Sequence, residues 1–401
     1  MTLTLLFDLD DTLLDTNTET FIPAYFQALS EHLTPFVSPT LLISSLLAST
    51  KLMLASEDPS RTLQEVFEED FYRRLGVSKT DLAETLEGFY DNVFPHLQSK
   101  TKPRPEAAPL IEWAFSQGYR IAIATDPLFP RKATHHRLRW AGFDPAQFEI
   151  VSSFETFHFT KTHTAYYAEF LGQLGWPEGP LLMVGNDAER DLIPASRLGL
   201  KTYFIDGDPA SSPGLEAGRG KLADLRPWLE STDLSTLEPS FQSREAVLAI
   251  LQSTPAVLNT LTSSLSPEQW RSELSHDDWA LNEIVCHLRD TEREIHQLQL
   301  KLLLEREDAF IPRPDTAVWA SERDYLHVDG AAALREFTSA RIETMQTLKN
   351  AAEAVWSRRA RHAIFGPTNF LEVCGFMAEH DRMHIQQAWK TLLHFSQLTK
   401  Q

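Results

Sequence analysis

The residues best suited to chemistry stand at the end of an apolar run near the start of the chain. Residues 5–13 place Asp8 and Asp10 directly after leucines and a phenylalanine, and Thr12 follows two positions later. Apolar residues at this density predict a buried parallel strand, whose carboxyl end lies where open α/β folds carry their sites. Because unpaired buried charge is costly, the acids indicate a function rather than only an acidic turn, which is the alternative.

Three further polar segments follow downstream, each next to an apolar or helical pattern. They are Thr125 and Asp126 after the apolar residues 120–124, Lys161 before a helical pattern at 165–174, and Asn186 and Asp187 after the apolar residues 181–184, with Asp191 beyond. Two carboxylates, a hydroxyl, an ammonium and a distal acid cluster together suit phosphoryl transfer through an aspartyl-phosphate.

In this order the segments resemble the four motifs of the haloacid dehalogenase-like hydrolase superfamily, over about residues 1–231. The resemblance implies that Asp8 is the nucleophile and a Mg²⁺ ligand. It implies that Asp10 is the general acid/base and binds Mg²⁺ through its backbone carbonyl, and that Lys161 and Thr125 hold the phosphoryl group. Thr12 and Asp126 join Thr125 as expected substrate-binding residues.

The fourth motif departs from the family pattern, which has Gly-Asp followed by another Asp. Aligned by length, Asn186 takes the usual metal-binding position, whereas Asp187 takes it when aligned by chemistry. An amide oxygen binds Mg²⁺ more weakly than a carboxylate. Both residues therefore stay candidate Mg²⁺ ligands, and the departure concerns metal affinity more than reaction class.

Asp10 distinguishes between the reactions that the superfamily carries out. Its dehalogenases need no acid at this position, whereas its phosphatases need one to protonate the leaving alkoxide and then to deprotonate water. The sequence therefore favours a magnesium-dependent phosphatase of a small phosphorylated metabolite over a dehalogenase. No segment reaches the ~20 apolar residues of a membrane span, which excludes the membrane ATPases of the superfamily.

Composition is that of a globular protein with two to three domains. The 401 residues are 42% hydrophobic and 23% charged, with a net charge of −19. No basic face favours nucleic acid or an anionic membrane as a partner. The two cysteines, Cys286 and Cys374, lack metal-ligand spacing and are expected to be buried. Sparse cysteines and a first strand that leaves no room for a signal peptide predict a cytoplasmic location.

The pattern predicts an α/β Rossmann-like parallel sheet with inserted helices, followed by an all-α four-helix bundle. The resemblance implies that the inserted helices form a helical cap over the site. Strands are expected at residues 120–125, 148–152, 181–184 and 201–205, and residues 206–220 are expected to be irregular. Cap helices are expected at 20–32, 39–54, 62–75 and 79–94. The predicted domains are residues 1–15 with 101–231 for the core, 16–100 for the cap, 232–242 for a linker and 243–401 for the bundle.

The C-terminal part shows four long amphipathic patterns and no strand signal. The patterns cover residues 244–265, 281–304, 330–354 and 368–395. His380 and His384 are spaced i, i+4, which puts both imidazoles on one helix face, and His287 lies on the second pattern. Imidazoles from facing helices are a common way to build a metal site, although this spacing alone also fits surface histidines.

Together with Trp279 and Gln387, these histidines resemble the DinB superfamily over about residues 243–397. The resemblance implies a second divalent metal (zinc, nickel or iron) held by His287, His380 and His384. Two alternatives stay open for the bundle: a thiol- or metal-dependent transferase or hydrolase that is the main activity, and a non-catalytic interaction module that serves homodimer formation or partner binding. The remaining histidines considered, expected to be surface or hydrogen-bonded residues, are His276, His296, His327 and His362.

Overall fold

The computed structural model describes residues 2–211, 214–273, 278–316 and 318–398. Contacts between residues divide the chain into two compact units. The first comprises Met1–Phe170 and Pro177–Ser240, and the second comprises Leu171–Trp176 and Phe241–Gln401. Within the described residues, no helix combines the length and apolar character that crossing a membrane requires.

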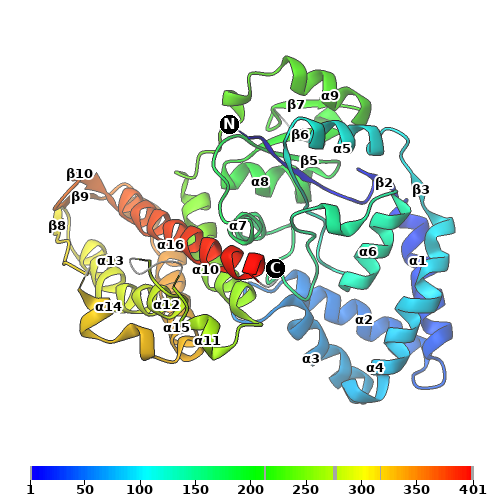
Figure 1. Cartoon of the computed structure of the whole chain (residues 1–401), viewed down its shortest axis with the longest axis horizontal. Coiled ribbons are helices and arrows are strands. Elements are labelled where there is room, and N and C mark those ends of the chain that lie inside the picture. Colours follow the sequence, from blue (N-terminus) through cyan, green and yellow to red (C-terminus); the bar gives the residue numbers. More distant parts are fainter. Residues whose placement is uncertain (1, 212–213, 274–277, 317, 399–401) are drawn as a thin grey trace. The chain divides into compact units, whose positions relative to one another are not determined.

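The first unit is built on a five-stranded parallel sheet with the order β4-β1-β5-β6-β7 (Figure 1). Its strands are β1 (Thr4–Phe7), β4 (Arg120–Ile123), β5 (Leu181–Gly185), β6 (Lys201–Ile205) and β7 (Gly218–Gly220). The helices that alternate with them are α5 (Ala107–Ser116), α6 (Arg131–Trp140), α7 (Thr164–Gln173), α8 (Ile193–Leu198) and α9 (Leu222–Ser231). β1 lies between β4 and β5 and is buried along its whole length, as its apolar run predicts. The predicted Rossmann-like class is confirmed.

Two expectations about strands in this unit are wrong. Residues 148–152 form no strand, and only Val151 makes an isolated bridge to Ile123. Backbone hydrogen bonds still join this stretch to β4, from the Ile123 N–H to the Ile150 carbonyl at 2.8 Å and from the Ser152 N–H to the Ile123 carbonyl at 3.1 Å. A bend before Val151 and a turn after it limit the extended stretch, and the Ser152 hydroxyl bonds the Thr125 carbonyl at 2.6 Å. Conversely, residues 218–220, expected to be irregular, form the edge strand β7. A Cβ atom at Gly218 would lie 2.4 Å from the Trp228 ring, so only glycine lets the backbone approach there.

The cap consists of helices inserted between the short antiparallel strands β2 (Leu14–Asp15) and β3 (Lys102–Pro103). These helices are α1 (Thr18–Leu33), α2 (Pro39–Leu54), α3 (Leu63–Leu75), α4 (Lys79–Gly88), the π-turn η1 (Phe89–Val93) and the 3₁₀ turn η2 (Phe94–Lys100). Side chains of Ser38, Thr62 and Ser78 cap α2, α3 and α4. The Phe94 ring stacks on Trp140 of α6 at 5.3 Å, which anchors the cap to the core.

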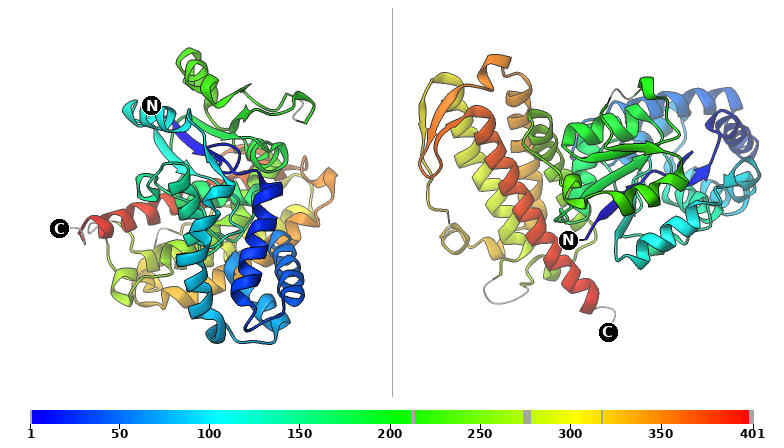
Figure 2. Two further views of the ribbon diagram at one scale, coloured as in Figure 1. Left: turned by 90° about the vertical axis from the view of Figure 1, so that its right-hand side faces the viewer. Right: turned by 90° about the horizontal axis from the view of Figure 1, so that it is seen from above.

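The second unit contains the four predicted long helices, which lie side by side (Figure 2). They are α10 (Arg244–Thr262), α12 (Leu281–Thr291) continued by η7 (Glu292–His296) and α13 (Gln297–Glu305), α15 (Gly330–Lys349), and α16 (Phe370–Leu398). Two short helices, α11 (Pro267–Trp270) and α14 (Trp319–Glu322), lie in the connections. The remaining short turns of the chain are η3 (Pro145–Gln147), η4 (Ala188–Leu192), η5 (Pro209–Ser211), η6 (Leu234–Leu237), η8 (Tyr325–His327) and η9 (Glu353–Val355).

The expectation that strands are absent after residue 243 is wrong. The connections between long helices form a three-stranded sheet of β8 (Ala309–Ile311), β9 (Arg359–His362) and β10 (Gly366–Asn369). β9 and β10 are an antiparallel hairpin, and β8 runs parallel to β9. These strands are short, and β9 carries two arginines, so they show no apolar alternation that a sequence pattern could reveal.

One buried arginine connects the four long helices of this unit. The Arg341 guanidinium, on α15, donates to Glu292 Oε1 at 3.0 Å and Oε2 at 2.7 Å, to Asp381 of α16, and to the Leu251 carbonyl of α10 at 2.9 Å. Arg341, Glu292 and Asp381 are at most 1% exposed. Burial alone favours a neutral acid, but Arg341 lowers the pKa of Glu292 to about 2.

Replacing Arg341 by leucine should strongly destabilise the second unit. The variant leaves two carboxylates buried without their cation, which costs about 3–5 kcal/mol. We expect a correspondingly lower free energy of unfolding in urea, followed by circular dichroism on the full chain. Arg335→Leu, an exposed position on the same helix, is the matched control and should change stability by less than about 0.5 kcal/mol.

The pH dependence provides a second check on this network. In the wild type the lowered pKa of Glu292 contributes stability that is lost as the pH falls below the unfolded-state value. In Arg341→Leu the two unpaired carboxylates take up protons as the pH falls, which stabilises the folded variant. The difference in free energy of unfolding between wild type and variant should therefore become smaller from about pH 8 to about pH 5. A gap that is constant over this range would contradict the assignment.

Candidate active site and metal centre

The carboxyl ends of β1, β4 and β5 meet at one edge of the sheet and open into a cavity of about 400 Å³. Most of the site residues predicted from the sequence line this cavity, namely Asp8, Asp10, Thr125, Asp126, Lys161, Asn186 and Asp187. They come from four separate segments of the chain. The parallel sheet brings these segments together because consecutive strand ends share one edge.

Lys161 is the centre of the cluster. Its Nζ atom lies 2.6 Å from Asp8 Oδ1 and also pairs with Asp191, and all three side chains are buried. Asp191 in turn accepts the backbone N–H groups of Asn186 at 3.0 Å and Asp187 at 2.9 Å. Asp191 was not among the predicted site residues. Its position shortly after Asn186 and Asp187 is the sequence feature from which it could have been predicted.

The charge balance around Asp8 is uneven. Burial raises the pKa of Asp8 to about 8, against the effect of Lys161, and the neighbouring Asp191 and Asp10 raise it further. Burial also opposes the charge on Lys161, but Asp191 and Asp8 outweigh it and hold the pKa of that ammonium above its usual value. Two carboxylates thus face one permanent cation, which leaves room for further positive charge.

The Asp10 carboxylate is held on both oxygens. Oδ1 accepts a hydrogen bond from the Thr16 hydroxyl at 2.7 Å, and Oδ2 pairs with the Arg137 guanidinium. Arg137 is 2% exposed, and its guanidinium lies over the Phe129 ring at 4.6 Å. Arg137 could be predicted from the sequence only as part of a helix with basic residues. Its partner Asp10 lies 127 positions away, and a contact over that distance leaves no local pattern.

The three predicted substrate-binding residues are placed differently. Thr125 lies in the cavity wall, and Asp126 Oδ1 accepts the backbone N–H of Lys161 at 3.2 Å. Burial raises the pKa of Asp126, although Arg190 and Lys161 act in the opposite direction. Thr12 is fully buried behind the cavity, where its hydroxyl donates to Asn186 Oδ1 at 3.1 Å. The structure therefore places Thr12 against Asn186 instead of in the cavity wall.

Asn186 and Asp187 have different surroundings although both line the cavity. Asp187 Oδ1 caps the turn η4 by accepting the N–H groups of Glu189 at 2.9 Å and Arg190 at 3.1 Å. Its side chain is 42% exposed. Asn186 follows β5 directly, and its amide is oriented by Thr12. Asn186 Oδ1 accepts that bond with one of its two lone pairs, so both residues keep an oxygen lone pair for a ligand role beside Asp8.

The donor set of the cavity fits Mg²⁺. Six carboxylates line it against three cationic side chains. The acids are Asp8, Asp10, Asp11, Asp126, Asp187 and Asp191, and the cations are Arg137, Lys161 and Arg190. Mg²⁺ prefers hard oxygen ligands and supplies two positive charges, so the excess of negative charge suits it.

The second unit brings its three predicted histidines together. His287 lies on α12 and His380 and His384 on α16, and their candidate ligand nitrogens all lie within 4.8 Å of one another. The Nε2 atoms of His287 and His380 are 3.0 Å apart. Imidazole nitrogens bound tetrahedrally to one zinc ion are about 3.3 Å apart. The cluster therefore has the spacing that a shared divalent metal requires.

Neighbouring groups orient the histidines and keep them uncharged. His384 Nδ1 lies 3.1 Å from Gln387 Oε1, which leaves Nε2 for a metal, and the Trp279 ring stacks on His384 at 5.8 Å. Burial, with the neighbouring imidazoles, lowers the pKa of His287 to about 2 and of His384 to about 3. Neutral imidazole is the form that binds metal.

The other histidines are surface or hydrogen-bonded residues where the structure describes them, as expected. His296 is buried and bonds Glu292 through Nδ1 at 3.1 Å, and its ring centre lies 5.6 Å from that of His380. His327 is exposed beside Asp324. His362 accepts the backbone N–H groups of residues 364 and 365. His276 lies outside the described residues. Both cysteines are buried, as predicted.

Comparison with known proteins finds a similar family for each part of the chain. Residues 2–199 match the family model described as haloacid dehalogenase-like hydrolase, and residues 250–388 match that of the DinB superfamily. A search of curated proteins finds no match.

Three solved structures are among those to which parts of the chain are similar. A HAD phosphatase from Thermococcus onnurineus is 23% identical over 57% of this chain and 98% of its own, with a TM-score of 0.38. A 2-haloacid dehalogenase from Pseudomonas syringae pv. Tomato is 20% identical over 57% and 99%, with a TM-score of 0.43. YfiT from Bacillus subtilis, described as a probable metal-dependent hydrolase with a four-helix bundle, is 18% identical over 39% and 90%, with a TM-score of 0.36.

The sequence match of each segment agrees with the topology of its unit and with the residues that the unit brings together. The chain is thus similar to the haloacid dehalogenase-like hydrolases over residues 2–199 and to the DinB superfamily over residues 250–388.

Proposed function

We propose that the first unit is a magnesium-dependent phosphatase that hydrolyses a small phosphorylated metabolite through an aspartyl-phosphate on Asp8. The observation that carries this proposal is the pair of carboxylates at one cavity. Asp8 is bonded to the buried Lys161, and Asp10 is held by Arg137 and Thr16. A dehalogenase attacks carbon and has no proton to supply to an alkoxide, so a positioned second acid favours the phosphatase.

Each residue has a defined task in this reaction. An Asp8 oxygen attacks phosphorus, the bond from phosphorus to the ester oxygen breaks, and Asp10 gives its proton to the leaving alkoxide. Water then attacks the aspartyl-phosphate and Asp10 takes up a proton from it, which releases phosphate and restores Asp8. Arg137 and Thr16 hold the two Asp10 oxygens in position for both proton transfers. Lys161 and Thr125 hold oxygens of the phosphoryl group.

Mg²⁺ would be held by Asp8, the backbone carbonyl of Asp10 and Asn186. When bound, it neutralises charge on the phosphoryl oxygens and offsets the excess of carboxylates in the cavity. Asp187 is the alternative ligand, because its Oδ1 atom caps η4 while its other carboxylate oxygen can bind the metal.

Asp8→Asn should abolish phosphate release while the chain stays folded, because an amide is a very poor nucleophile. We expect a loss of about 10⁴-fold or more in kcat, measured as inorganic phosphate released from a panel of phosphate esters. Asp15→Asn, an exposed carboxylate in β2, is the matched control. Substantial turnover by Asp8→Asn on an ester that the wild type cleaves well would rule out the covalent mechanism.

Asp10→Asn should keep substrate binding and lose turnover, in a way that depends on the leaving group. General acid/base catalysis contributes about 10²–10⁴-fold, and most where the leaving alkoxide is strongly basic. We therefore expect an alkyl phosphate to lose far more kcat than an aryl phosphate with an acidic leaving group. Equal losses on both esters would make Asp10 a structural or metal-binding residue.

We propose further that the second unit binds a divalent metal, zinc, nickel or iron, through His287, His380 and His384. A cavity of about 300 Å³, lined in part by His296 and His380, lies beside the cluster. An open cavity next to a metal favours a metal-dependent hydrolase or transferase activity over a purely structural ion. This is the second candidate function of the chain.

Removal of metal should lower the melting temperature of the second unit, because metal binding stabilises the folded state. At a free metal concentration of about 100 times Kd we expect a shift of about 5–10 °C, followed by calorimetry of the full chain with and without chelator. His380→Ala should abolish the shift. His327→Ala, an exposed histidine of the same unit, should retain it.

His327 is a better control than His296, because His296 is buried and bonded to Glu292, so that its replacement would lower stability whether or not metal binds. A wild-type protein whose melting is indifferent to chelator and to added zinc or nickel would leave the histidines as structural residues.

A further inference from the structure

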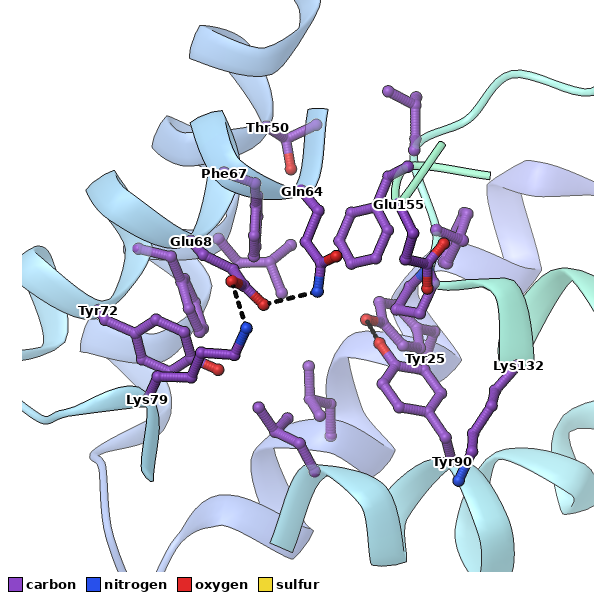
Figure 3. Close-up of a pocket in the computed structure, with 18 of the residues that line it drawn as sticks. Tyr25, Thr50, Gln64, Phe67, Glu68, Tyr72, Lys79, Tyr90, Lys132 and Glu155 are labelled. Carbon is purple, nitrogen blue, oxygen red and sulfur yellow. Dashed lines mark hydrogen bonds and ion pairs between the residues drawn. The ribbon is translucent and has the colours of Figure 1, made fainter. Parts of the chain in front are cut away.

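A second cavity of about 500 Å³ lies between the cap and the core of the first unit (Figure 3). Helices α1 to α4 contribute most of its wall, and the core contributes residues 128–132 and 154–155. Eight aromatic side chains line it, three of which are the tyrosines Tyr25, Tyr72 and Tyr90. A volume of this size is typical of pockets that enclose most of a drug-sized molecule.

This cavity adjoins the candidate active site. Ile22, Leu128 and Phe129 line both cavities. Phe129 contacts Arg137 with its face, at 4.6 Å from the ring centre, and Tyr25 at 5.4 Å in an edge-on arrangement. Arg137 holds Asp10, the proposed proton donor to the leaving group. Ile22, Leu128 and Phe129 are therefore the side chains between the phosphoryl site and the cap cavity, and a group attached to a phosphoryl oxygen near Asp10 would reach the cap cavity past them.

The charged side chains around the cap cavity are bonded to protein partners. Glu68 pairs with Lys79 at 2.7 Å and accepts a hydrogen bond from Gln64 at 2.9 Å (Figure 3). Lys132 pairs with Glu87 and with Asp91. Glu155 accepts the backbone N–H of Arg131. A charged or polyhydroxylated ligand would have to displace these bonds or leave its own polar groups unpaired, which is costly in an apolar cavity.

Two of the three tyrosines, Tyr25 and Tyr90, offer a polar contact to a neutral ligand. The Tyr25 and Tyr90 hydroxyls are 3.1 Å apart, so one of them donates to the other (Figure 3). Burial raises the pKa of Tyr25 to about 12, which keeps it protonated. Two hydroxyls carry two hydrogens, and the bond between them uses one. The second hydrogen can be donated to one acceptor atom of a ligand.

We infer that the cap cavity binds the alcohol portion of the substrate, and that this portion is a neutral, ring-containing apolar group. The inference rests on the proposed phosphatase function and deepens it by naming the substrate class. The phosphoryl group lies at Asp8 and Lys161, and the ring system lies against Phe67, Phe71 and Phe129. Aromatic side chains bind flat ring systems well by offset or edge-on contact.

The substrate class is tested with two alkyl phosphates whose leaving alcohols have similar acidity, 2-(1-naphthyl)ethyl phosphate and ethyl phosphate. With the full chain and Mg²⁺ we expect kcat/KM to be about 100-fold higher for the naphthyl ester, since apolar pockets discriminate about 10–200-fold even for one methylene. Glycerol 3-phosphate should resemble ethyl phosphate. Equal kcat/KM for the naphthyl and ethyl esters overturns the inference.

A variant that fills the cavity tests its location. Thr50 on α2 faces the cavity (Figure 3), and Lys51 is its exposed neighbour on the same helix. Thr50→Trp should lower kcat/KM for the naphthyl ester by about tenfold or more and leave the ethyl ester within about twofold. Lys51→Trp should change neither. A Thr50→Trp protein with wild-type melting that cleaves the naphthyl ester at the wild-type rate overturns the assignment of the cavity.

A binding measurement that needs no turnover distinguishes failure of the phosphatase proposal from failure of the inference about the cap cavity. If no ester releases phosphate, the phosphatase proposal fails, and the cavity is then examined by fluorescence titration with 2-(1-naphthyl)ethanol. Saturable binding that Thr50→Trp weakens and Lys51→Trp preserves supports an apolar ring site. Absence of saturable binding to the wild type overturns the inference.

Discussion

The ion pairs of Lys161 with Asp8 and Asp191 are the interaction on which the arrangement of the first unit depends. Removal of such charges from water costs several kcal/mol for each ion, and only close pairing offsets this cost. The ammonium is 1% exposed and lies between the residue that follows β1 and the turn that follows β5. Any displacement of either turn would leave a buried charge unpaired. The two motifs and the lysine are therefore fixed relative to one another by electrostatics as well as by the sheet.

Gly185 shows how closely the backbone has to approach for this pairing. A Cβ atom at Gly185 would lie 2.3 Å from Asp191 Oδ2, so a side chain there would prevent Asp191 from folding back toward Lys161. The same carboxylate accepts the N–H groups of Asn186 and Asp187. A single acid thus holds the turn that presents the candidate metal ligands, and glycine is the residue that makes the contact sterically feasible.

The second unit uses buried charge in a related way. Arg341 binds Glu292 and Asp381, which lie close in sequence to the histidines: Asp381 follows His380 directly, and Glu292 lies five positions after His287. The two carboxylates outnumber the single guanidinium, as the acids outnumber the cations at Asp8. A divalent cation at the histidines would therefore face a net negative surrounding, which favours its binding.

The parts of the structure that the sequence predicts are those with a local signal. β1, β4, β5, β6 and the long helices follow from apolar runs and helical periodicity, and the site residues at strand ends follow from the parallel sheet. The strands β8 to β10 and the role of Arg137 leave no such signal, because their contacts join distant segments. Arg137 meets Asp10 across 127 positions, and helical periodicity says which face of α6 is buried without saying what lies against it.

The cap is the clearest example of this limit. Its aromatic residues have the spacing of amphipathic helices, and from the sequence alone every one of them is indistinguishable from a core residue. In the structure Phe21 and Phe94 are core residues, whereas Phe67, Tyr72 and Tyr90 are partly exposed and line a cavity. Apolar area left facing water forgoes about 25 cal/mol per Å² of stabilisation, which a bound apolar group would recover.

The sheet edge at Asp8 and the cap cavity therefore have separate tasks in the first unit. The carboxylates and the lysine at the sheet edge are constrained by one another, so a change in any of them disturbs the whole cluster. The side chains of the cap cavity contact one another mainly through dispersion, which tolerates substitution of similar volume. Selectivity for the leaving group can therefore change in the cap while the phosphoryl site at Asp8 stays intact, and residues such as Thr50 and Phe67 are where such change would act.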